Sequence, residues 1–423
     1  MKVSYQFENS ILSFNFTLEK HYGDRDIYKI GKRTIKLNQT NVMFIMPYVF
    51  DIKTIHPDLL GLVAILLIYP YVGKRIELSF DISQYLANAF SKCGKIIVPI
   101  NPSITKRNVT DNSYPSIAYS GGTDSTAGLI VMPKNTKVCF LDRIIPINKK
   151  SIYCKDNIYL TLDLLINNDY SVNIIQSDME YLREPVGFPI DIGCGIANIL
   201  LADTLNIDSI AYGYANHHKE FLNNNTIDYI CTGTFKLYRK DQDIDIEKRY
   251  SYWNELYQSV DLYITMPIMG INEIMTQKIV LSTCYSNIIQ SCMRGKIGME
   301  CGKCIKCFKT NIVKHIYQHK NIGFKELNSY LKCIEREIEK KYNMKLENID
   351  EILTLESIFL LIMIYYNNDK PHPIVEKFKK IYSKYNEKNI LFKWNETSSV
   401  FIMSKYRNII TQNLINLTHL EFS

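Results

Sequence analysis

A short loop in the first third of the chain combines residue types that bind phosphate. It follows a β-prone run at 116–119 and precedes an expected helix that ends near Val131. Two glycines let backbone N–H groups approach an anion closely, and a helix start adds unpaired donors and the positive end of a dipole. The order predicts an anion cup for a nucleotide, with seven candidate ligands: Ser120, Gly121, Gly122, Thr123, Asp124, Ser125 and Thr126.

Within this loop, Ser120, Asp124 and Ser125 are candidate catalytic residues. The hydroxyl groups complete the cup, and Asp124 either helps to hold Mg²⁺ or caps the helix. No lysine follows the glycines, which argues against a P-loop NTPase. An ordinary Gly-Gly turn capped by the aspartate is the alternative. Gly213 ends an expected strand at the same edge, so it is a further candidate for close approach to the nucleotide.

Four of the 11 cysteines crowd into one stretch, with the spacing Cys292-x8-Cys301-x2-Cys304-x2-Cys307. Three thiolates at two-residue gaps converge from a tight turn, and Cys292 supplies a fourth ligand, which suits tetrahedral Zn²⁺ with Zn–S distances of ~2.3 Å. An iron–sulfur cluster is the alternative, because C-x2-C-x2-C also begins ferredoxin motifs. The upstream fourth cysteine and the absence of a following Cys-Pro favour zinc. The pattern indicates a reducing cytosol rather than a disulfide framework.

Four further residues are candidates for contacts with a substrate. Asp178 and Glu184 follow the expected third strand of the middle region, where their carboxylates could contact Mg²⁺ or an amine. Exposed loop acids are the alternative interpretation. Arg249 and Arg294 could each bind an anionic substrate through a two-pronged contact, and surface ion pairs are the alternative there.

Three regions separate by their patterns. Residues 1–112 read as an α+β module of short alternating strands. Residues 113–310 alternate strands and helices, so they predict an α/β fold with a doubly wound parallel sheet that binds ligands at the carboxyl ends of its strands. Residues 311–423 read as a helical module that caps the middle domain or binds a partner.

The expected elements follow from the apolar periodicity. Strands are expected at 3–7, 11–16, 33–37, 75–80, 95–99, 116–119, 138–141, 172–175 and 209–212. Helices are expected at 59–68, 83–91, 195–205, 324–338 and 349–366.

Composition limits the class of protein. The chain has 423 residues, 46% hydrophobic and 12% aromatic, which excludes disorder as its main state. The net charge of +7 is a mild excess, better explained by solvated helical faces than by a nucleic-acid surface, although nucleic acid is not excluded. The most apolar stretch, 59–71, is shorter than the ~20 residues of a membrane span. The N-terminus has no uninterrupted apolar core of a signal segment, so the expected location is the cytoplasm.

The two motifs together resemble a known family. The loop is similar to the PP-loop of ATP pyrophosphatases, SGGxDS, at every fixed position, and the cysteine spacing at the end of the same α/β region resembles that of 7-cyano-7-deazaguanine synthase, the QueC family. The resemblance covers 116–310. It implies an adenine nucleotide α-hydrolase-like fold, ATP held by residues 120–126 and zinc held by the four cysteines.

The substrate region departs from that family. Where the synthase carries a VPGRN-like segment, this chain reads Glu-Pro-Val-Gly-Phe-Pro at 184–189, and its Gly/Tyr/Pro/Asp-rich loop is replaced by Gly-Tyr-Ala-Asn-His-His at 213–218. The Thr-Lys pair of the family is missing after Pro267. The chain is also longer and resembles the enlarged QueC-like relatives of bacterial antiphage systems, some of which attach a deazaguanine to a protein.

The sequence therefore predicts a C–N ligase with the cofactors ATP, Mg²⁺ and Zn²⁺. By the resemblance, it adenylates a carboxylate on a 7-deazaguanine-like base, and an amine then displaces AMP. The sequence does not identify the amine. The expected partners are the deazaguanine-like small molecule and, through the terminal modules, a protein acceptor or a defence-system partner. Two alternatives stay open: a PP-loop enzyme that thiolates or aminates a tRNA base, and a non-catalytic nucleotide-binding subunit of a defence complex.

Overall fold

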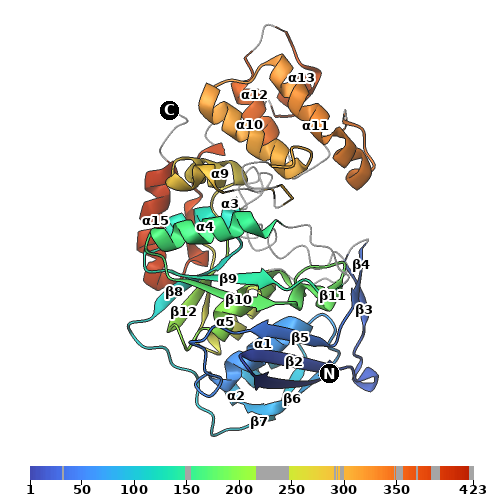
Figure 1. The fold of residues 1–423 in the computed structure, drawn as a ribbon, viewed down its shortest axis with the longest axis vertical. Helices are drawn as coiled ribbons and strands as arrows, with labels where there is room; N and C mark the ends of the chain where they lie inside the picture. The colour runs from blue at the N-terminus through green and yellow to red at the C-terminus, as the bar shows by residue number, and fades with distance from the viewer. Residues whose placement is uncertain are drawn as a thin grey trace.

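The computed structural model of the chain is drawn in Figure 1. The residues that it describes are 1–30, 33–147, 154–215, 247–289, 292, 294–295, 300–346, 348, 356–367, 370–382 and 391–418.

Most strands belong to one large sheet. Within the described residues these strands are β1 (Lys2–Glu8), β2 (Ile11–Thr17), β5 (Asn41–Ile45), β6 (Arg75–Ile82), β7 (Ile96–Ile100), β8 (Tyr114–Tyr119), β9 (Lys137–Arg143), β10 (Val172–Ser177), β12 (Ile207–Ala211) and β13 (Tyr263–Thr265). They pair in the order β13-β12-β8-β9-β10-β5-β2-β1-β6-β7. Neighbouring strands are parallel except at β10–β5, β5–β2 and β2–β1. The expected α/β class with a mostly parallel sheet is confirmed.

The N-terminal strands extend this sheet across residue 112. β5 pairs antiparallel with β10, with Ile45 opposite Gln176 and Phe44 opposite Ser177. A second, smaller sheet of β11 (Arg183–Glu184), β4 (Arg33–Leu37) and β3 (Ile27–Ile30) lies beside it. The alternating runs therefore form the expected strands, and long-range pairing joins them to the middle region.

The helices as described are α1 (Pro57–Ile68), α2 (Gln84–Ser91), α3 (Thr123–Val131), α4 (Lys155–Asn167), α5 (Ile196–Leu200), α8 (Glu247–Gln258), α9 (Glu273–Leu281), α10 (Ile305–His319), α11 (Phe324–Tyr342), α12 (Glu356–Tyr365), α13 (Pro373–Tyr382) and α15 (Ser404–Thr418). Short 3₁₀ turns are η1 (Lys20–Tyr22), η2 (Met179–Leu182), η3 (Asp191–Gly195), η4 (Cys284–Asn287) and η7 (Glu396–Phe401). α5 is shorter than the expected helix at 195–205, because turns follow it and Asn206, with φ of +51°, redirects the chain into β12.

Both faces of the parallel strands are covered, as their unbroken apolar sequences require. Along β8, Ile117 and Tyr119 join the apolar cluster of α3, α4, α9 and α15. Ala118 between them joins the cluster of α1, α5 and α8 on the other face. This alternation follows from the two-residue repeat of a strand. The end of β8 is therefore held rigidly between two layers, and the loop that follows it has a fixed starting point.

The C-terminal region is helical in its described parts, as expected. α10 to α13 pack around a separate apolar cluster at the top of Figure 1. The chain then returns, and α15 packs against α3 and α9 beside the sheet. α15 thereby covers the same face of the sheet as α3, α4 and α9.

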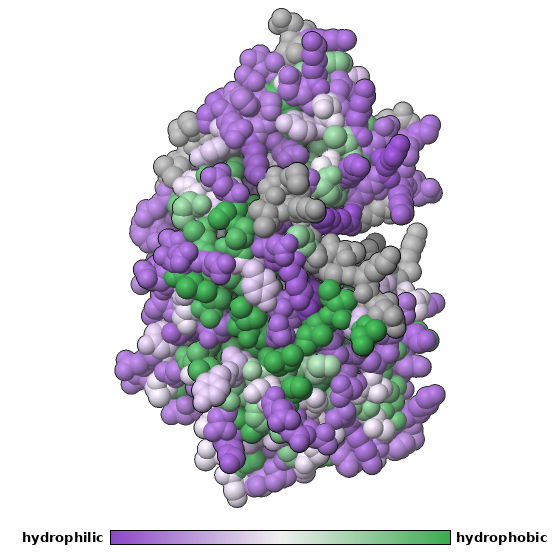
Figure 2. All heavy atoms as spheres, viewed as in Figure 1, coloured by the Kyte–Doolittle hydropathy of each residue, from purple (hydrophilic) through white to green (hydrophobic). Residues whose placement is uncertain are grey.

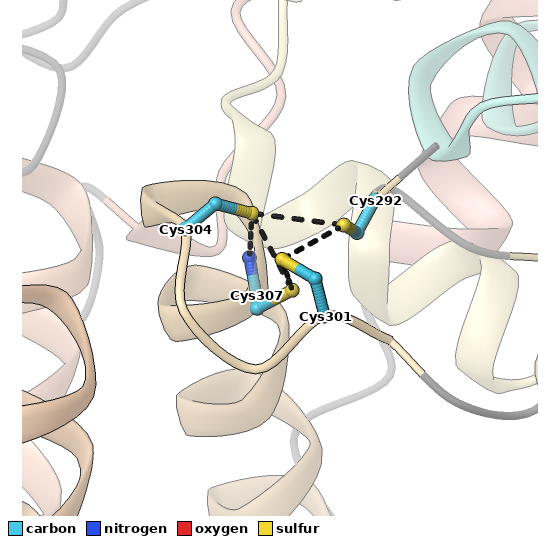
Figure 3. Close-up of side chains that lie close together, drawn as sticks. All are labelled: Cys292, Cys301, Cys304 and Cys307. Carbon is cyan, nitrogen blue, oxygen red and sulfur yellow. Dashed lines mark hydrogen bonds between the residues drawn. The ribbon is translucent and has the colours of Figure 1, made fainter. Parts of the chain in front are cut away.

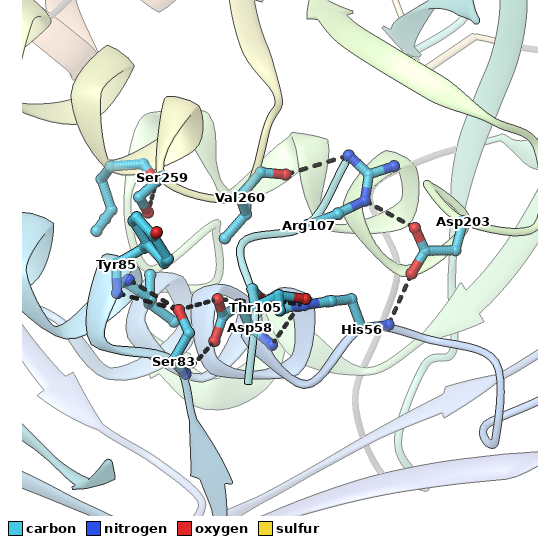
Figure 4. Close-up of polar contacts among 11 residues, drawn as sticks. His56, Asp58, Ser83, Tyr85, Thr105, Arg107, Asp203, Ser259 and Val260 are labelled. Carbon is cyan, nitrogen blue, oxygen red and sulfur yellow. Dashed lines mark hydrogen bonds and ion pairs between the residues drawn. The ribbon is translucent and has the colours of Figure 1, made fainter. Parts of the chain in front are cut away.

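The linker into β8 is fixed by the buried side chain of Arg107 (Figure 4). Its Nε lies 2.7 Å from Oδ1 of Asp203, and its other nitrogens donate to the carbonyl oxygens of Val260, Asp261 and Ile207, each at 3.1 Å. Oδ2 of Asp203 accepts the backbone N–H of His56, the residue that caps α1, at 2.7 Å. This network fastens α1, the linker and the start of β12 together.

The face shown in Figure 2 is mostly hydrophilic over the helical top of the molecule, and hydrophobic residues gather around its middle. None of the described helices has the length and apolar character needed to cross a membrane.

Candidate functional site: an anion cup beside a four-cysteine cluster

The loop after β8 adopts a conformation that requires its first glycine. Gly121 has φ of +75°, and a Cβ at this position would lie 3.0 Å from Cγ2 of Ile158 on α4. Gly122 then serves as the N-cap of α3, which starts at Thr123. The two glycines thus turn the chain sharply from the end of a buried strand into the start of a helix.

Hydroxyl groups hold the loop in shape. The Ser120 and Ser125 hydroxyls lie 3.0 Å apart, and Ser125 donates to the carbonyl oxygen of Gly122 at 3.0 Å. The Thr126 hydroxyl is buried, donates to the same carbonyl at 2.9 Å and contacts the Tyr119 hydroxyl at 2.9 Å. Thr126 therefore supports the loop from beneath.

A cavity of about 300 Å³ opens on the other side of the loop. Six of the eight predicted nucleotide ligands line it: Ser120, Gly122, Thr123, Asp124, Ser125 and Gly213. The two that do not, Gly121 and Thr126, are buried. The structure therefore brings the predicted loop and Gly213 together around one space.

Gly213 approaches the loop more closely than any other residue type could. A Cβ on Gly213 would lie 2.7 Å from Cα of Ser125 and 2.8 Å from its backbone nitrogen. Because both are backbone atoms at the start of α3, no side-chain rotation would relieve the contact. This close approach lets the segment after β12 form one wall of the cavity.

Asp124 faces the cavity while its carboxylate is held from one side. Oδ1 accepts a hydrogen bond from the Thr276 hydroxyl at 2.7 Å. Desolvation in the cavity raises the pKa of Asp124, and the nearby Glu273 carboxylate raises it further, against the opposing effects of the Thr276 hydrogen bond, Lys306 and Lys309. The charge state of this carboxylate therefore depends on one neighbouring acid and two neighbouring lysines.

Sequence reasoning missed half of the cavity wall. The remaining lining residues are Arg143, Glu273, Gln277, Lys306, Lys309 and Thr310. Glu273 and Gln277 come from α9, and Lys306, Lys309 and Thr310 come from the first two turns of α10. A local signal did exist for the lysines, which are interleaved with the predicted metal ligands in Cys-Ile-Lys-Cys-Phe-Lys at 304–309.

The starts of three helices therefore meet at this cavity. Thr123 begins α3, Glu273 begins α9, and Lys306 lies in the first turn of α10. Each helix start carries partial positive charge from its unpaired N–H groups. Lys306, Lys309 and Arg143 also line the cavity, where Glu273 pairs with Lys309 and Glu180 pairs with Arg143. The helix starts and Lys306 supply positive charge that suits a phosphate-bearing ligand.

Two buried polar atoms of the wall have no hydrogen-bond partner among the described residues. They are the amide oxygen of Gln277 and the hydroxyl of Thr310, on side chains that are 8% and 6% exposed. Leaving such atoms unpaired costs about 1–3 kcal/mol each, so proteins rarely do so without reason. Both side chains line the cavity.

The four predicted metal ligands come together next to the cavity (Figure 3). The sulfur atoms of Cys292 and Cys301 lie 3.4 Å apart, those of Cys301 and Cys307 3.6 Å, those of Cys304 and Cys292 3.7 Å, and those of Cys304 and Cys307 3.4 Å. A tetrahedral zinc site with Zn–S bonds of ~2.3 Å requires sulfurs about 3.8 Å apart. The expectation that these cysteines form one possible metal site is confirmed.

The cysteine cluster also begins α10. Cys304 is the N-cap of this helix, and its sulfur accepts the backbone N–H of Cys307 at 3.4 Å. The Cys307 thiol and this N–H lower the pKa of Cys304. The backbone N–H of Ile305 donates to Oε2 of Glu337 on α11 at 2.6 Å. The first turn of α10 is thus fixed from both sides.

Three of the four weaker substrate candidates, Asp178, Glu184 and Arg294, are not among the lining residues. Asp178 is buried and accepts hydrogen bonds from the N–H of Met43 at 2.9 Å and from Gln39 at 3.0 Å, so it joins β10 to the neighbouring strand β5. Glu184 is exposed in β11. Arg294 is exposed and forms an ion pair with Glu337 at 3.8 Å. Arg249 belongs to α8, and its side chain lies outside what the structure describes.

A family of unknown function (DUF6395) matches residues 252–420 of the chain. The match includes the cysteine cluster and the cavity residues of α9 and α10, and the loop at 120–126 lies outside it. No curated protein and no solved structure matches the chain.

Proposed function

We propose that the protein is a PP-loop enzyme that uses ATP to adenylate a carboxylate and then joins the acyl group to an amine. The observation that carries this proposal is the cavity at residues 120–126, which is lined by the Ser-Gly-Gly-Thr-Asp-Ser loop, by Gly213 and by three cations.

The strand order supports a doubly wound fold of this kind. In chain order from β8, the parallel strands lie 5-4-1-2-3 across the sheet, so the order reverses between β8 and β12. Open parallel sheets bind ligands at the carboxyl ends of their strands, at the point of reversal. Ser120 follows β8 and Gly213 follows β12, and both line the cavity.

The polar groups of the cavity are suited to a diphosphate leaving group. The N–H groups of the loop and of the α3 start would bind phosphate oxygens, and Ser120 and Ser125 would add hydroxyl donors. Lys306, Lys309 and Arg143 would compensate the charge that develops when pyrophosphate departs. Fixed donors of this kind contribute several kcal/mol in a site from which water is excluded.

The donor sets also fit the two expected metals. Asp124 and Glu273 offer carboxylate oxygens at the cavity, the ligand type that Mg²⁺ prefers. When bound, Mg²⁺ would neutralise phosphate charge. The four sulfurs suit a closed structural Zn²⁺ site rather than a catalytic one, because all four ligands come from the protein.

The proposed reaction has two steps. A carboxylate oxygen of the substrate attacks the α-phosphorus of ATP, and the bond from this phosphorus to the bridging oxygen of the β-phosphate breaks. The products are an acyl-adenylate and pyrophosphate. An amine then attacks the acyl carbon, loses a proton to solvent or to a nearby base, and displaces AMP to leave an amide. The resemblance to 7-cyano-7-deazaguanine synthase supplies the substrate class, a carboxylated 7-deazaguanine.

Incubation of the purified protein with ATP, Mg²⁺ and candidate acids tests the proposal, with products identified by mass. We expect AMP and pyrophosphate only when a deazaguanine acid is present, and a loss of about 10²–10³-fold in rate for Asp124→Asn or Ser125→Ala. Ser103→Ala, at an exposed serine, is the control. ADP and phosphate as products would refute the proposal. Pyrophosphate release that depends on RNA and not on the acid would instead favour an RNA-modifying enzyme.

A further inference from the structure

The first two turns of α10 present two lysines to the cavity. Lys306 and Lys309 are three residues apart, so they lie on the same face of the helix, and both line the cavity. Lys309 forms an ion pair with Glu273 at 2.7 Å. Lys306 is exposed and forms no ion pair with a described residue. The helix thus brings one paired and one available cation to the loop.

The cysteine cluster determines where this face of α10 points. Cys304 caps the helix and Cys307 lies between the two lysines in its first turn. A metal bound to all four sulfurs would fix Cys307 with respect to Cys292 and Cys301, which come from the preceding chain. Because a helix is rigid over one turn, fixing Cys307 also fixes the backbone on which Lys306 and Lys309 stand.

The segment between Cys292 and Cys301 also contacts α4, the helix behind the loop at 120–126. The Asn157 side chain of α4 donates to the carbonyl oxygen of Gly295 at 3.3 Å. The next residue, Ile158, packs where a Cβ on Gly121 would lie. The segment between Cys292 and Cys301 therefore contacts the helix that supports the loop. The cluster is connected to both the loop and the lysines, which lie on either side of the cavity.

The buried hydroxyl of Thr310, next to Lys309, is the independent sign of a ligand at this wall. It has no hydrogen-bond partner among the described residues, although the side chain is 6% exposed. The amide oxygen of Gln277 on α9 is in the same situation on the adjoining wall. The Thr310 hydroxyl can donate to a phosphate oxygen, whereas the Gln277 amide oxygen can only accept. The α10 side of the cavity therefore brings two cations together with one unpaired hydroxyl donor, groups that suit phosphate oxygens.

We propose that Lys306 and Lys309 bind the β- and γ-phosphates of the nucleotide, and that the metal-loaded cysteine cluster holds them in position. This inference rests on the proposed function for the identity of the nucleotide. Its consequence is a coupling between two sites: the protein binds pyrophosphate more tightly with the metal than without it. By linkage, pyrophosphate strengthens metal retention by the same factor.

Inorganic pyrophosphate is the probe that tests the lysines, with affinities measured by calorimetry on the full chain. We expect Lys306→Ala and Lys309→Ala each to weaken binding about 10-fold, because each removes a charge-assisted contact. Lys379→Ala is the matched control, since Lys379 is exposed on α13 and pairs with Glu376. Unchanged affinity in both cavity variants would overturn the proposal.

Chemical acetylation of lysines, read by mass spectrometry, tests the location directly. Pyrophosphate should protect Lys306 and Lys309 in the native protein and leave the exposed Lys303, in the cysteine hairpin, as reactive as before. Protection of Lys303 alone, or of neither cavity lysine, would contradict a site at this face.

The coupling is tested without relying on activity. Cys301→Ser removes the most accessible of the four ligands, and we expect it to lower both metal content and pyrophosphate affinity, the latter about 10-fold. Glu337→Ala disturbs the same turn without touching a cysteine, because it removes the acceptor of the Ile305 N–H. It should weaken pyrophosphate binding, and Glu337→Gln, which retains an acceptor, should restore it. Full affinity in Cys301→Ser and Glu337→Ala would refute the coupling.

These outcomes separate the inference from the proposed function. Lysine-dependent pyrophosphate binding with no adenylation product would uphold the inference and reject the reaction. Adenylation that persists in both lysine variants, with pyrophosphate affinity unchanged, would uphold the proposed reaction and reject the inference about the lysines.

Discussion

The ammonium group of Lys309 lies 2.7 Å from a carboxylate oxygen of Glu273, and this ion pair joins α10 to α9 at the wall of the cavity. The other oxygen of Glu273 accepts the hydroxyl of Ser357 on α12 at 2.9 Å. One carboxylate therefore ties three helices together and holds a cation beside the anion cup. A phosphate bound at this cavity, as proposed, would compete with Glu273 for Lys309.

Glu273→Gln should strengthen binding of pyrophosphate in the absence of Mg²⁺. The change removes a negative charge from an anion site and leaves an oxygen that can still accept the Ser357 hydroxyl. We expect about 5-fold tighter binding, equivalent to ~1 kcal/mol for a partly exposed charge. Calorimetry measures the affinity, and Glu376→Gln on α13 is the control. A weaker affinity in Glu273→Gln would show that the carboxylate does not compete with the ligand.

Gly213→Ala should damage the cup from the β12 side. Its Cβ would lie 2.7 Å from Cα of Ser125, so the backbone must shift, at about 1–3 kcal/mol of folding stability. We expect nucleotide affinity to fall by at least about 10-fold, because the donors of the loop lose their geometry. Binding of a fluorescent ATP analogue and thermal unfolding report the two effects.

Gly128→Ala is a matched control for this variant. Gly128 lies in α3, where a Cβ would make an ordinary contact of 3.4 Å with Ile117. Alanine should stabilise the helix by up to ~1 kcal/mol and leave nucleotide binding intact. Equal losses of binding in both variants would mean that Gly213 has no special role.

The cysteine cluster should bind one metal ion per chain in tetrahedral thiolate geometry. Replacement by Co²⁺ should give the intense absorption of a four-sulfur tetrahedral site, and a chelator should lower the melting temperature, because the metal binds the folded state. Acid should release the ion as the thiolates become protonated. Cys333→Ser, at an exposed cysteine outside the cluster, should change nothing. If the purified protein contained iron and sulfide instead, the site would be an iron–sulfur cluster and the zinc prediction would be wrong.

Asp191 should make the protein less stable as pH rises from about 4 to about 6. Burial raises the pKa of Asp191 to about 6, against the lowering effect of Arg183, whereas the unfolded chain has a pKa of ~3.9. Between these pH values the folded state retains a proton that the unfolded state has lost. The contribution of Asp191 to the free energy of unfolding is therefore fully present below pH ~4 and lost above pH ~6.

Asp191→Asn therefore removes this pH dependence. Compared with the wild type, the stability difference between pH 4 and pH 7.5 should change by about 2 kcal/mol, measured by urea unfolding. Glu184→Gln, at an exposed carboxylate nearby, is the control. The same pH profile in wild type and Asp191→Asn would reject the assignment.

Arg107 should be essential for stability and irrelevant to the chemistry of the cup. Arg107→Ala leaves the carboxylate of Asp203 and three carbonyl groups without their partner, which costs about 3–5 kcal/mol. Arg107→Lys should rescue little, because one ammonium cannot reproduce the planar set of donors. Thermal unfolding tests this, with Lys106→Ala at the exposed neighbour as the control. A variant as stable as the wild type would contradict the role of the network.

Local pattern was sufficient for much of the fold. Expected strands at 116–119, 138–141, 172–175 and 209–212 correspond to β8, β9, β10 and β12 within a few residues. The convergence of the four cysteines also followed from spacing, because two-residue gaps leave few other arrangements. In both cases the information is contained in residues close together in the chain.

The rest depended on contacts between distant residues. β5 and β10 pair although about 130 residues separate them in the chain. The local sequence of a strand does not show which other strand it pairs with. α9 is buried nearly all round, so its sequence lacks the two-faced pattern that marks a surface helix. Glu273 and Gln277 were missed for that reason. Lys306 and Lys309 read as ordinary charged helix residues, because nothing local shows that α10 packs against α9 beside the loop.

The antiparallel contact between β5 and β10 limits how the chain can be divided. A fragment that starts at residue 113 would have the backbone N–H and C=O groups of β10 uncovered along one side, as an open edge able to pair with another molecule. Shortened versions made to isolate the nucleotide region should therefore aggregate, and the first 112 residues act as a shield for that edge as well as a part of the sheet.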